Sequence, residues 1–342
     1  MASKRILWID AVKGFAIIAV VLGHVLLGFE QNNSFPDYYN SIHFVKLWIY
    51  SWHMPLFIFI SGITFKMSCY KDNKWNFEKI KKNTLNLLIL YVVFASILPT
   101  LKFIFSSFVN HPVKLNEILF RILLPNNLMW YLWVMIIYYA VFPLILKKVV
   151  FKIPIFALLL CISCLVYYLY SIEMFNELAI KKLFYCSVYF YLGLNIESLA
   201  DAINKKIMII ACMLNGIFIA YEYVVVSLKW FNNDAANIMF YQINAFAEII
   251  LAFFIFKTFF NKELKLCYIG KQSLIIYLIH TYLVTIMRNV VVRLNFNVII
   301  AIITCTIIPL ILCIGLAIWS DHCSLLNYVF KPILLFDKKK ST

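Results

Sequence analysis

Three ionisable side chains interrupt an apolar stretch near the start of this 342-residue chain. Asp10, Lys13 and His24 lie in the segment IDAVKGFAIIAVVLGH, residues 9–24, which is otherwise hydrophobic. An ionisable group near the centre of a bilayer costs at least ~2.5–3.5 kcal/mol on insertion scales. At about 100° per residue, Lys13 lies roughly 60° from Asp10 around a helix, and His24 roughly 20° from Lys13. All three side chains therefore share one helix face.

This polar stripe has two interpretations. Asp10 and Lys13 are three residues apart and can pair, whereas His24 lies ~16 Å beyond Lys13 along the axis. A stripe of that length favours a functional, wetted path through the protein. The alternative is a structural Asp10–Lys13 pair together with a histidine that hydrogen-bonds to a neighbouring helix.

Further polar groups occur in other apolar segments. His53 precedes Pro55, which frees a backbone carbonyl, and imidazole suits proton transfer near neutral pH. Two buried histidines on consecutive spans can converge, although His53 alone more often makes a helix–helix hydrogen bond. Tyr277 and His280 are three residues apart and lie close on one side of their helix. Glu248 is a carboxylate within a span and needs a partner, for which a Lys or His is the natural choice.

The composition indicates that these residues lie in a membrane protein. The chain is 64% hydrophobic and 14% charged, and apolar runs of helical length recur throughout, without the alternation of a β-barrel. We predict an all-α, polytopic membrane protein that forms a single domain over residues 1–342. Ten spans are expected near 6–29, 43–65, 84–105, 128–146, 153–172, 183–199, 207–227, 238–260, 267–290 and 298–318.

The distribution of basic residues predicts the orientation. Most of the 31 Lys and Arg residues fall in segments that are cytoplasmic if both termini face the cytoplasm, as the positive-inside rule favours. We therefore expect a multi-pass protein of the cell (inner or cytoplasmic) membrane. The net charge of +15 then needs no nucleic acid partner. The basic loops are explained by topology and anionic lipid headgroups, or alternatively by a ligand.

The cysteines do not indicate a metal or redox site. Nine are scattered along the chain, and the single C-x-x-C pair, Cys161 and Cys164, has no second pair or His ligand in its helix. They are interpreted as small apolar packing residues, and we expect no metal.

Several motifs together resemble the integral-membrane acyltransferase-3 family, and within it the sugar O-acetylases of the fucose 4-O-acetylase type. They run in family order over residues 5 to about 280. The matching positions are Ile9, Asp10, Lys13, Gly14, Ala16, Ile17, Gly23 and His24; His53, Met54, Pro55, Leu56, Phe57, Phe59, Ile60, Ser61 and Gly62; Trp130, Tyr131 and Leu132; Tyr191, Leu192 and Gly193; and Ile269, Gly270, Lys271, Ser273, Leu274, Ile276, Tyr277, Leu278 and His280.

The resemblance implies transfer of an acyl group from a cytoplasmic coenzyme A thioester to a hydroxyl, usually on a surface or lipid-linked glycan. Acetyl-CoA is the expected donor substrate, and no bound cofactor is implied. His24 matches the family's essential histidine, and Lys13 stands where many members have Arg. Many members also carry R-x-x-x-R at the start of the third span, where this chain has Lys82 and Asn86.

These arguments divide the candidate residues into two groups. His24, Asp10, Lys13 and His53 are candidates for catalysis, with His24 as the base or a site of acylation, Asp10 or Glu248 as an orienting carboxylate, and Lys13 holding the donor or anchoring Asp10. Candidate substrate-binding residues are Lys79, Lys81, Lys82, Trp130, Glu248, Tyr277 and His280. The rival classes are a proton-coupled transporter or flippase, which would use the same buried groups as a relay, and a scaffold in which they serve helix packing.

Overall fold

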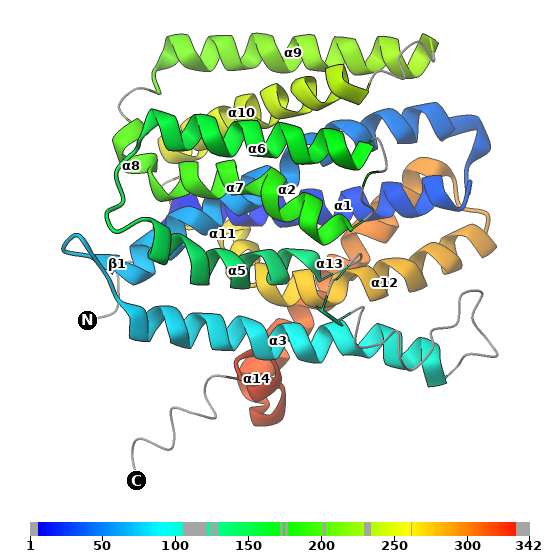
Figure 1. Cartoon of the computed structure of the whole chain (residues 1–342). Helices are drawn as coiled ribbons and strands as arrows, with labels where there is room; N and C mark the ends of the chain where they lie inside the picture. The colour runs from blue at the N-terminus through cyan, green and yellow to red at the C-terminus, as the bar shows by residue number, and fades with distance from the viewer. Residues whose placement is uncertain are drawn as a thin grey trace. The chain divides into compact units, whose positions relative to one another are not determined.

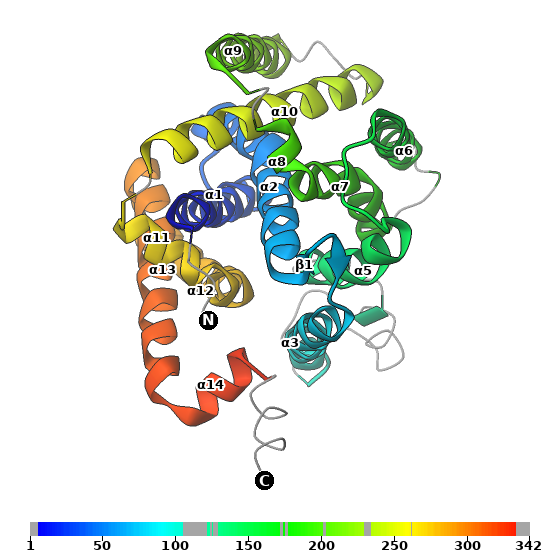
Figure 2. The same ribbon diagram turned by 90° about the vertical axis from the view of Figure 1, so that its left-hand side faces the viewer.

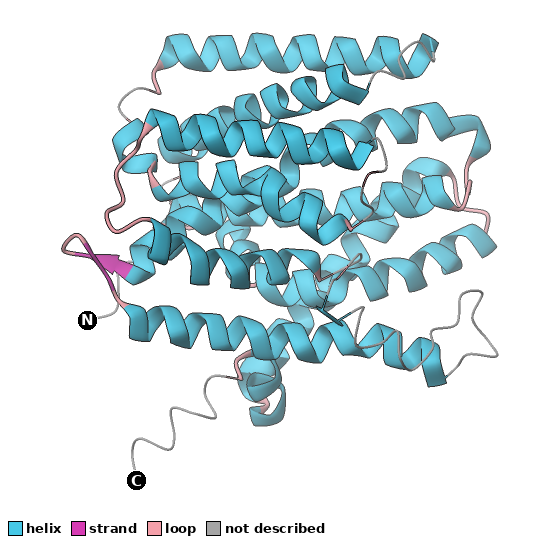
Figure 3. Ribbon diagram, in the orientation of Figure 1, coloured by secondary structure: helices cyan, strands magenta, loops and turns pink. Residues whose placement is uncertain are grey.

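The computed structural model is almost entirely helical in the part of the chain that it describes (Figure 3). It describes residues 6–104, 122–123, 125, 129–171, 174, 177–200, 203–228, 234–260 and 262–332. The elements are α1 (Leu7–Gln31), η1 (Pro36–Tyr38), α2 (Tyr39–Cys69), β1 (Tyr70–Lys71), β2 (Lys74–Trp75), α3 (Phe77–Ile104), α5 (Trp130–Ile145), α6 (Ile153–Ser171), α7 (Leu178–Leu194), α8 (Ile196–Leu199), α9 (Lys205–Leu228), α10 (Asp234–Phe259), α11 (Lys265–Lys271), α12 (Ser273–Arg293), α13 (Val298–His322) and α14 (Ser324–Phe330) (Figure 1).

Each of the ten predicted spans falls on one or two of these helices. Eight helices of the described chain are long and apolar enough to cross a membrane, so the protein is a multi-pass membrane protein. The other two predicted spans fall mainly on α5 and α7, which have 16 and 17 residues. At 1.5 Å per residue these helices are about 24–26 Å long, shorter than a hydrocarbon core of about 30 Å. The total of ten spans and the orientation therefore stay predictions.

Two predicted spans are interrupted, and their predicted continuity was wrong. The span expected at 183–199 is divided between α7 and α8 at Asn195, whose side-chain amide donates to the Tyr191 carbonyl at 2.9 Å. The span expected at 267–290 is divided between α11 and α12 at Gln272. There the Gln272 N–H lies within reach of three preceding carbonyls instead of one, which closes α11 with a tight turn. Both breaks coincide with short polar stretches, because Lys271 and Ser273 flank Gln272, and Glu197 and Ser198 follow Asn195.

A short hairpin lies between α2 and α3 and was not predicted. Tyr70 pairs with Trp75 and Lys71 with Lys74. The two-residue loop Asp72–Asn73 has φ values of 50° and 58°, as a type I′ turn requires. The Trp75 indole fixes the hairpin by donating to the Leu146 carbonyl at 2.6 Å.

The chain divides into two compact units. One contains residues 1–61 and 196–318, and the other contains residues 62–195 and 319–342. Helix α2 contributes to both without a break. The prediction of a single domain stays a prediction.

Very close helix packing organises the first unit. Helix α1 packs against α10, α11 and α12 (Figure 2). Gly14 on α1 faces the backbone carbonyl of Leu266, and Gly270 on α11 faces that of Asp10. A Cβ atom at either glycine would collide with that carbonyl. Only glycine lets the two backbones approach this closely, so the glycines of the two matching motifs position α1 on α11.

The second unit uses the same device. Helix α7 packs against α5 and α6. Gly62, in the last third of α2, faces the Phe190 carbonyl and the Cα atom of Gly193 on α7. Phe65 stacks on Tyr139 with ring centroids 4.1 Å apart. Two further motif glycines therefore mark a close helix crossing.

The α1–α11 crossing can be tested by adding one methyl group. Gly270→Ala should lower the thermal unfolding temperature in detergent by several degrees, because the backbones must separate. Gly216→Ala on α9 is the matched control, since nothing lies within 4 Å of its Cβ position. Alanine is the better helix former by ~1 kcal/mol, so the control should be neutral or stabilising. Equal unfolding temperatures for the two variants would contradict the crossing.

Candidate functional site

Three histidines from three helices meet in the first unit. The ring centroids of His24 on α1 and His280 on α12 are 5.1 Å apart. His53 on α2 lies beside Tyr50, with centroids 4.8 Å apart, and the Tyr50 ring lies 6.4 Å from that of His24. Both other histidines are close enough to His24 to interact with it electrostatically. Histidines from the first two helices therefore lie close to one another, which the sequence analysis left as a possibility, and His280 joins them.

Two of these histidines have a defined tautomer. His53 Nδ1 lies 2.7 Å from the Ile49 carbonyl, and His280 Nδ1 lies 2.8 Å from the Ile276 carbonyl. A carbonyl oxygen can only accept, so each Nδ1 must carry the proton. In the neutral form of each ring the acceptor is then Nε2. His280 Nε2 is buried without a hydrogen-bond partner among the described residues. The cluster therefore contains an acceptor atom that no described residue uses.

His24 differs from the other two in its exposure. His53 and His280 are 3% and 1% exposed, whereas His24 remains partly accessible. None of the contacts of His24 with other described residues is a hydrogen bond or an ion pair. No described residue therefore takes up its ring nitrogens, and the residue is partly exposed.

Tyr50 is a site residue that the sequence analysis missed. Its hydroxyl is buried and has no hydrogen-bond partner in the described chain. His43, Lys46, Tyr50 and His53 follow one another at spacings of three, four and three residues, so they share one face of α2. This spacing was the signal that could have identified Tyr50.

Asp10 and Lys13 lie at the other end of α1. The helix is continuous from Leu7 to Gln31, so both residues share a face with His24, as the spacing predicts. Asp10 is 8% exposed and lies at the crossing with α11. Since Lys13 and His24 are ~16 Å apart along the axis, they serve different ends of the polar stripe.

Glu248 has a different kind of partner from the one expected. No Lys or His of the described chain bonds to its carboxylate. The amide of Asn215 on α9 instead donates to it at 2.5 Å, and Trp48 also contacts it. Neutral donors can satisfy a buried carboxylate. Asn215 also bonds to Asn244 at 2.8 Å, and Asn244 to Ser51 at 2.7 Å, so a polar chain joins α9, α10 and α2.

Tyr277 lies beside the histidine cluster, as its spacing from His280 predicts. It is 6% exposed, and its ring centroid is 6.2 Å from that of His280. It is placed to support the His280 ring.

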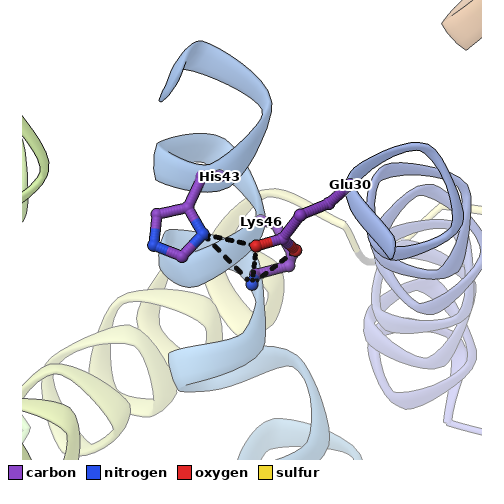
Figure 4. Close-up of polar contacts among 3 residues, drawn as sticks. All are labelled: Glu30, His43 and Lys46. Carbon is purple, nitrogen blue, oxygen red and sulfur yellow. Dashed lines mark hydrogen bonds and ion pairs between the residues drawn. The ribbon is translucent and has the colours of Figure 1, made fainter. Parts of the chain in front are cut away.

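An ion-pair cluster ties the last turn of α1 to the start of α2 (Figure 4). Glu30 lies 2.6 Å from Lys46 and 2.5 Å from His43 Nδ1. The Glu30 and Lys46 side chains are 10% and 13% exposed. This part-buried cluster, which the sequence analysis did not identify, fixes the position of the α1–α2 turn.

The remaining candidates belong to the second unit. Lys79 lines a hollow of about 740 Å³ beside the hairpin, together with Lys71, Lys74 and Trp75. Lys81 and Lys82 are exposed on the first turns of α3. Trp130 begins α5, and the Lys182 ammonium lies 5.4 Å from its ring centroid. Among all described residues, no three His, Cys, Asp or Glu side chains are arranged to hold a metal ion.

The fold and the cluster define a class: a multi-pass helical membrane protein with several histidines gathered inside one helical unit. Comparison with known families then gives the identity. A model of the acyltransferase-3 family, described as an acyltransferase domain, matches residues 6–318, and the chain belongs to this family. No curated protein and no solved structure matches the chain. Family membership makes it a membrane acyltransferase.

The ion-pair cluster predicts a stability effect. Glu30→Gln should leave the Lys46 ammonium part-buried without a counter-charge, at a cost of roughly 1–3 kcal/mol, between the costs for surface and buried pairs. Thermal unfolding in detergent measures it. The double variant Glu30→Gln/Lys46→Met should lose less than the sum of the single losses.

The control for this prediction is the exposed pair of Asp321 and Lys331, whose charged groups are 2.9 Å apart. Asp321→Asn should cost ~1 kcal/mol or less. If the double variant lost as much stability as the two single variants together, Glu30 and Lys46 would not be coupled.

Proposed function

We propose that this protein is a membrane O-acyltransferase that moves an acyl group, in particular acetyl, from cytoplasmic acyl-CoA to a hydroxyl of a cell-surface or lipid-linked glycan. Membership of the acyltransferase-3 family supports the reaction class. The observation that carries the proposal is the placement of His24, an accessible imidazole beside two buried ones. The motifs shared with the fucose 4-O-acetylase type favour a sugar acceptor.

The proposed chemistry begins at His24. Transfer needs a base that takes the proton of the acceptor hydroxyl as its oxygen attacks the thioester carbonyl. His24 meets the requirements, because its ring is accessible and holds no partner that would block a nitrogen. The tetrahedral intermediate then collapses to the ester, the carbon–sulfur bond breaks, and the thiolate of coenzyme A receives a proton. The acyl thioester and the alcohol are thereby converted to an ester and the free thiol of coenzyme A.

The neighbours of His24 have complementary roles in this proposal. In its neutral form His280 carries its acceptor at Nε2, which has no hydrogen-bond partner among the described residues, so it can orient a hydroxyl. Tyr50 supplies a buried O–H with no partner in the described chain. We therefore assign Tyr50 as the donor that stabilises the developing oxyanion.

The donor is proposed to approach from the cytoplasm. Three lysines line the hollow beside the hairpin, and Lys81 and Lys82 follow Lys79 on α3. Their charges suit the phosphates of coenzyme A, but each lysine acts as a point charge without the bidentate fork of arginine. Lys13 supplies a further cation on α1. We place the protein in the cell membrane with both termini inside, as the charge pattern predicts.

The function is tested by incubating the purified protein in detergent with acetyl-CoA and candidate glycans. Mass spectrometry should detect acceptor molecules heavier by one acetyl group. A vesicle assay in which a substrate crosses the membrane unmodified would instead support a transporter.

His24 is the residue whose replacement should be most damaging. Positioned general bases contribute typically 10²–10⁴-fold in rate, so His24→Ala and His24→Gln should both lose nearly all transfer while acyl-CoA binding persists. The amide of Gln keeps hydrogen bonding but cannot take a proton.

The matched control is His322→Gln, an exposed histidine at the end of α13, which should keep full activity. Substantial transfer by His24→Gln would make His24 a structural residue. His53 or His280 would then be the better candidate for the base.

The donor assignment makes a separate prediction. Lys81→Glu/Lys82→Glu should raise the apparent KM for acyl-CoA and change its dependence on salt, because screening weakens charge effects at exposed sites. Lys205→Glu/Lys206→Glu, at the exposed start of α9, is the control for topology and net charge. If the two double variants had the same KM for acyl-CoA at every salt concentration, Lys81 and Lys82 would be topology signals only.

A further inference from the structure

Arg288 on α12 is a cation without an anionic partner in the described chain. It lies eight residues after His280 and is half-buried. Its one electrostatic neighbour among the described residues is the thiol of Cys305 on α13, and no carboxylate there bonds to it. A part-buried guanidinium without a counter-ion is costly unless it meets an anion.

The Arg288 side chain lies across α1. Its guanidinium and Cδ atoms occupy the space that a Cβ atom at Gly28 would need. Gly28 follows His24 by four residues, which is about one turn, so the guanidinium lies ~6 Å further along α1 on nearly the same face. The cation therefore lies one turn above the accessible histidine.

The neighbouring charges do not neutralise Arg288. Glu30, on the next turn of α1, already binds Lys46 and His43 (Figure 4). Lys46 is satisfied by the same contact, at 2.6 Å. No described residue therefore neutralises Arg288, which leaves its guanidinium able to bind an external oxyanion.

A simpler explanation is that Arg288 reaches for lipid headgroups, as arginines near the ends of spans do. Arg293, in the last turn of the same helix, fits that description because its side chain is exposed. Arg288 instead lies against Gly28 of α1. The two arginines have equal charge and neighbouring positions, so Arg293 is a matched control.

We propose that Arg288 binds an oxyanion, a phosphate or carboxylate carried by the acceptor, and so holds the reacting hydroxyl at His24. This deepens and rests on the proposed function. The acceptor class is an anionic sugar, such as a sugar phosphate or a sugar acid, with the hydroxyl roughly one helical turn from the charge. The planar guanidinium suits bidentate recognition of either group. Gly28 is the position that makes room for it.

Binding is measured first, because it does not require turnover. The purified protein in maltoside detergent, free of lipid phosphate, is titrated with glucose 1-phosphate, with uncharged methyl glucoside and with inorganic phosphate, and the unfolding temperature is recorded. Glucose 1-phosphate should stabilise the wild type most. Arg288→Gln should weaken this binding by roughly tenfold or more, because hydrogen bonds to charged groups are the strong ones. Arg293→Gln should bind as the wild type does.

Activity is measured second, with anionic and neutral sugars as acetyl acceptors. Arg288→Gln should raise the KM and lower kcat/KM for the anionic acceptor by roughly tenfold or more, and should reduce transfer to the neutral acceptor much less. Gly28→Ala should reproduce this selective loss, because the added methyl displaces the guanidinium. Failure of all transfer by the wild type, with charge-selective binding retained, would overturn the proposed function and not the oxyanion site.

Three outcomes would overturn the oxyanion site. Equal losses of glucose 1-phosphate binding in Arg288→Gln and Arg293→Gln would show that both arginines act only through overall positive charge. Stabilisation that needs anionic phosphatidylglycerol nanodiscs and ignores glucose 1-phosphate would make Arg288 a lipid anchor. Loss of acetyl-CoA binding in Arg288→Gln, with sugar binding intact, would place the donor phosphates there.

Discussion

The contact between Gly270 and the backbone of Asp10 is the constraint on which the first unit depends. It brings α11 against α1 without an intervening side chain, and Gly14 repeats the contact one turn away. The chain then turns at Gln272, and α12 continues beside α1. Two backbones in contact leave little freedom for a shift along the axis. His280 is therefore held opposite His24, and Arg288 opposite Gly28, by a packing event at the far end of the helix.

Burial of polar groups imposes the second constraint. In a bilayer each buried donor or acceptor needs a partner inside the protein. His53 and His280 direct their Nδ1 protons to carbonyls of their own helices, which orients their rings. The unused atoms, His280 Nε2 and the Tyr50 hydroxyl, are an acceptor and a donor beside His24. That combination matches a reaction which moves one proton and stabilises one oxyanion.

The sequence predicted those features that depend on periodicity along one helix. The shared face of Asp10, Lys13 and His24 follows from helix geometry alone, and α1 is continuous over all three. The pairing of Tyr277 with His280 was predictable for the same reason. Features that depend on another helix were not. The Asn215 partner of Glu248 lies 33 residues earlier, and no local pattern indicates it.

The breaks at Asn195 and Gln272 escaped prediction although each carries a local signal. Glu197 and Ser198 follow Asn195, and Lys271 and Ser273 flank Gln272, so short polar stretches interrupt both apolar runs. The hairpin after α2 also carried a local signal, because Asp and Asn tolerate positive φ and favour two-residue turns. Glycines marked the close crossings, but a sequence does not tell which backbone each glycine will meet. In this chain the motif glycines locate the crossings, and the crossings in turn decide which ionisable residues meet.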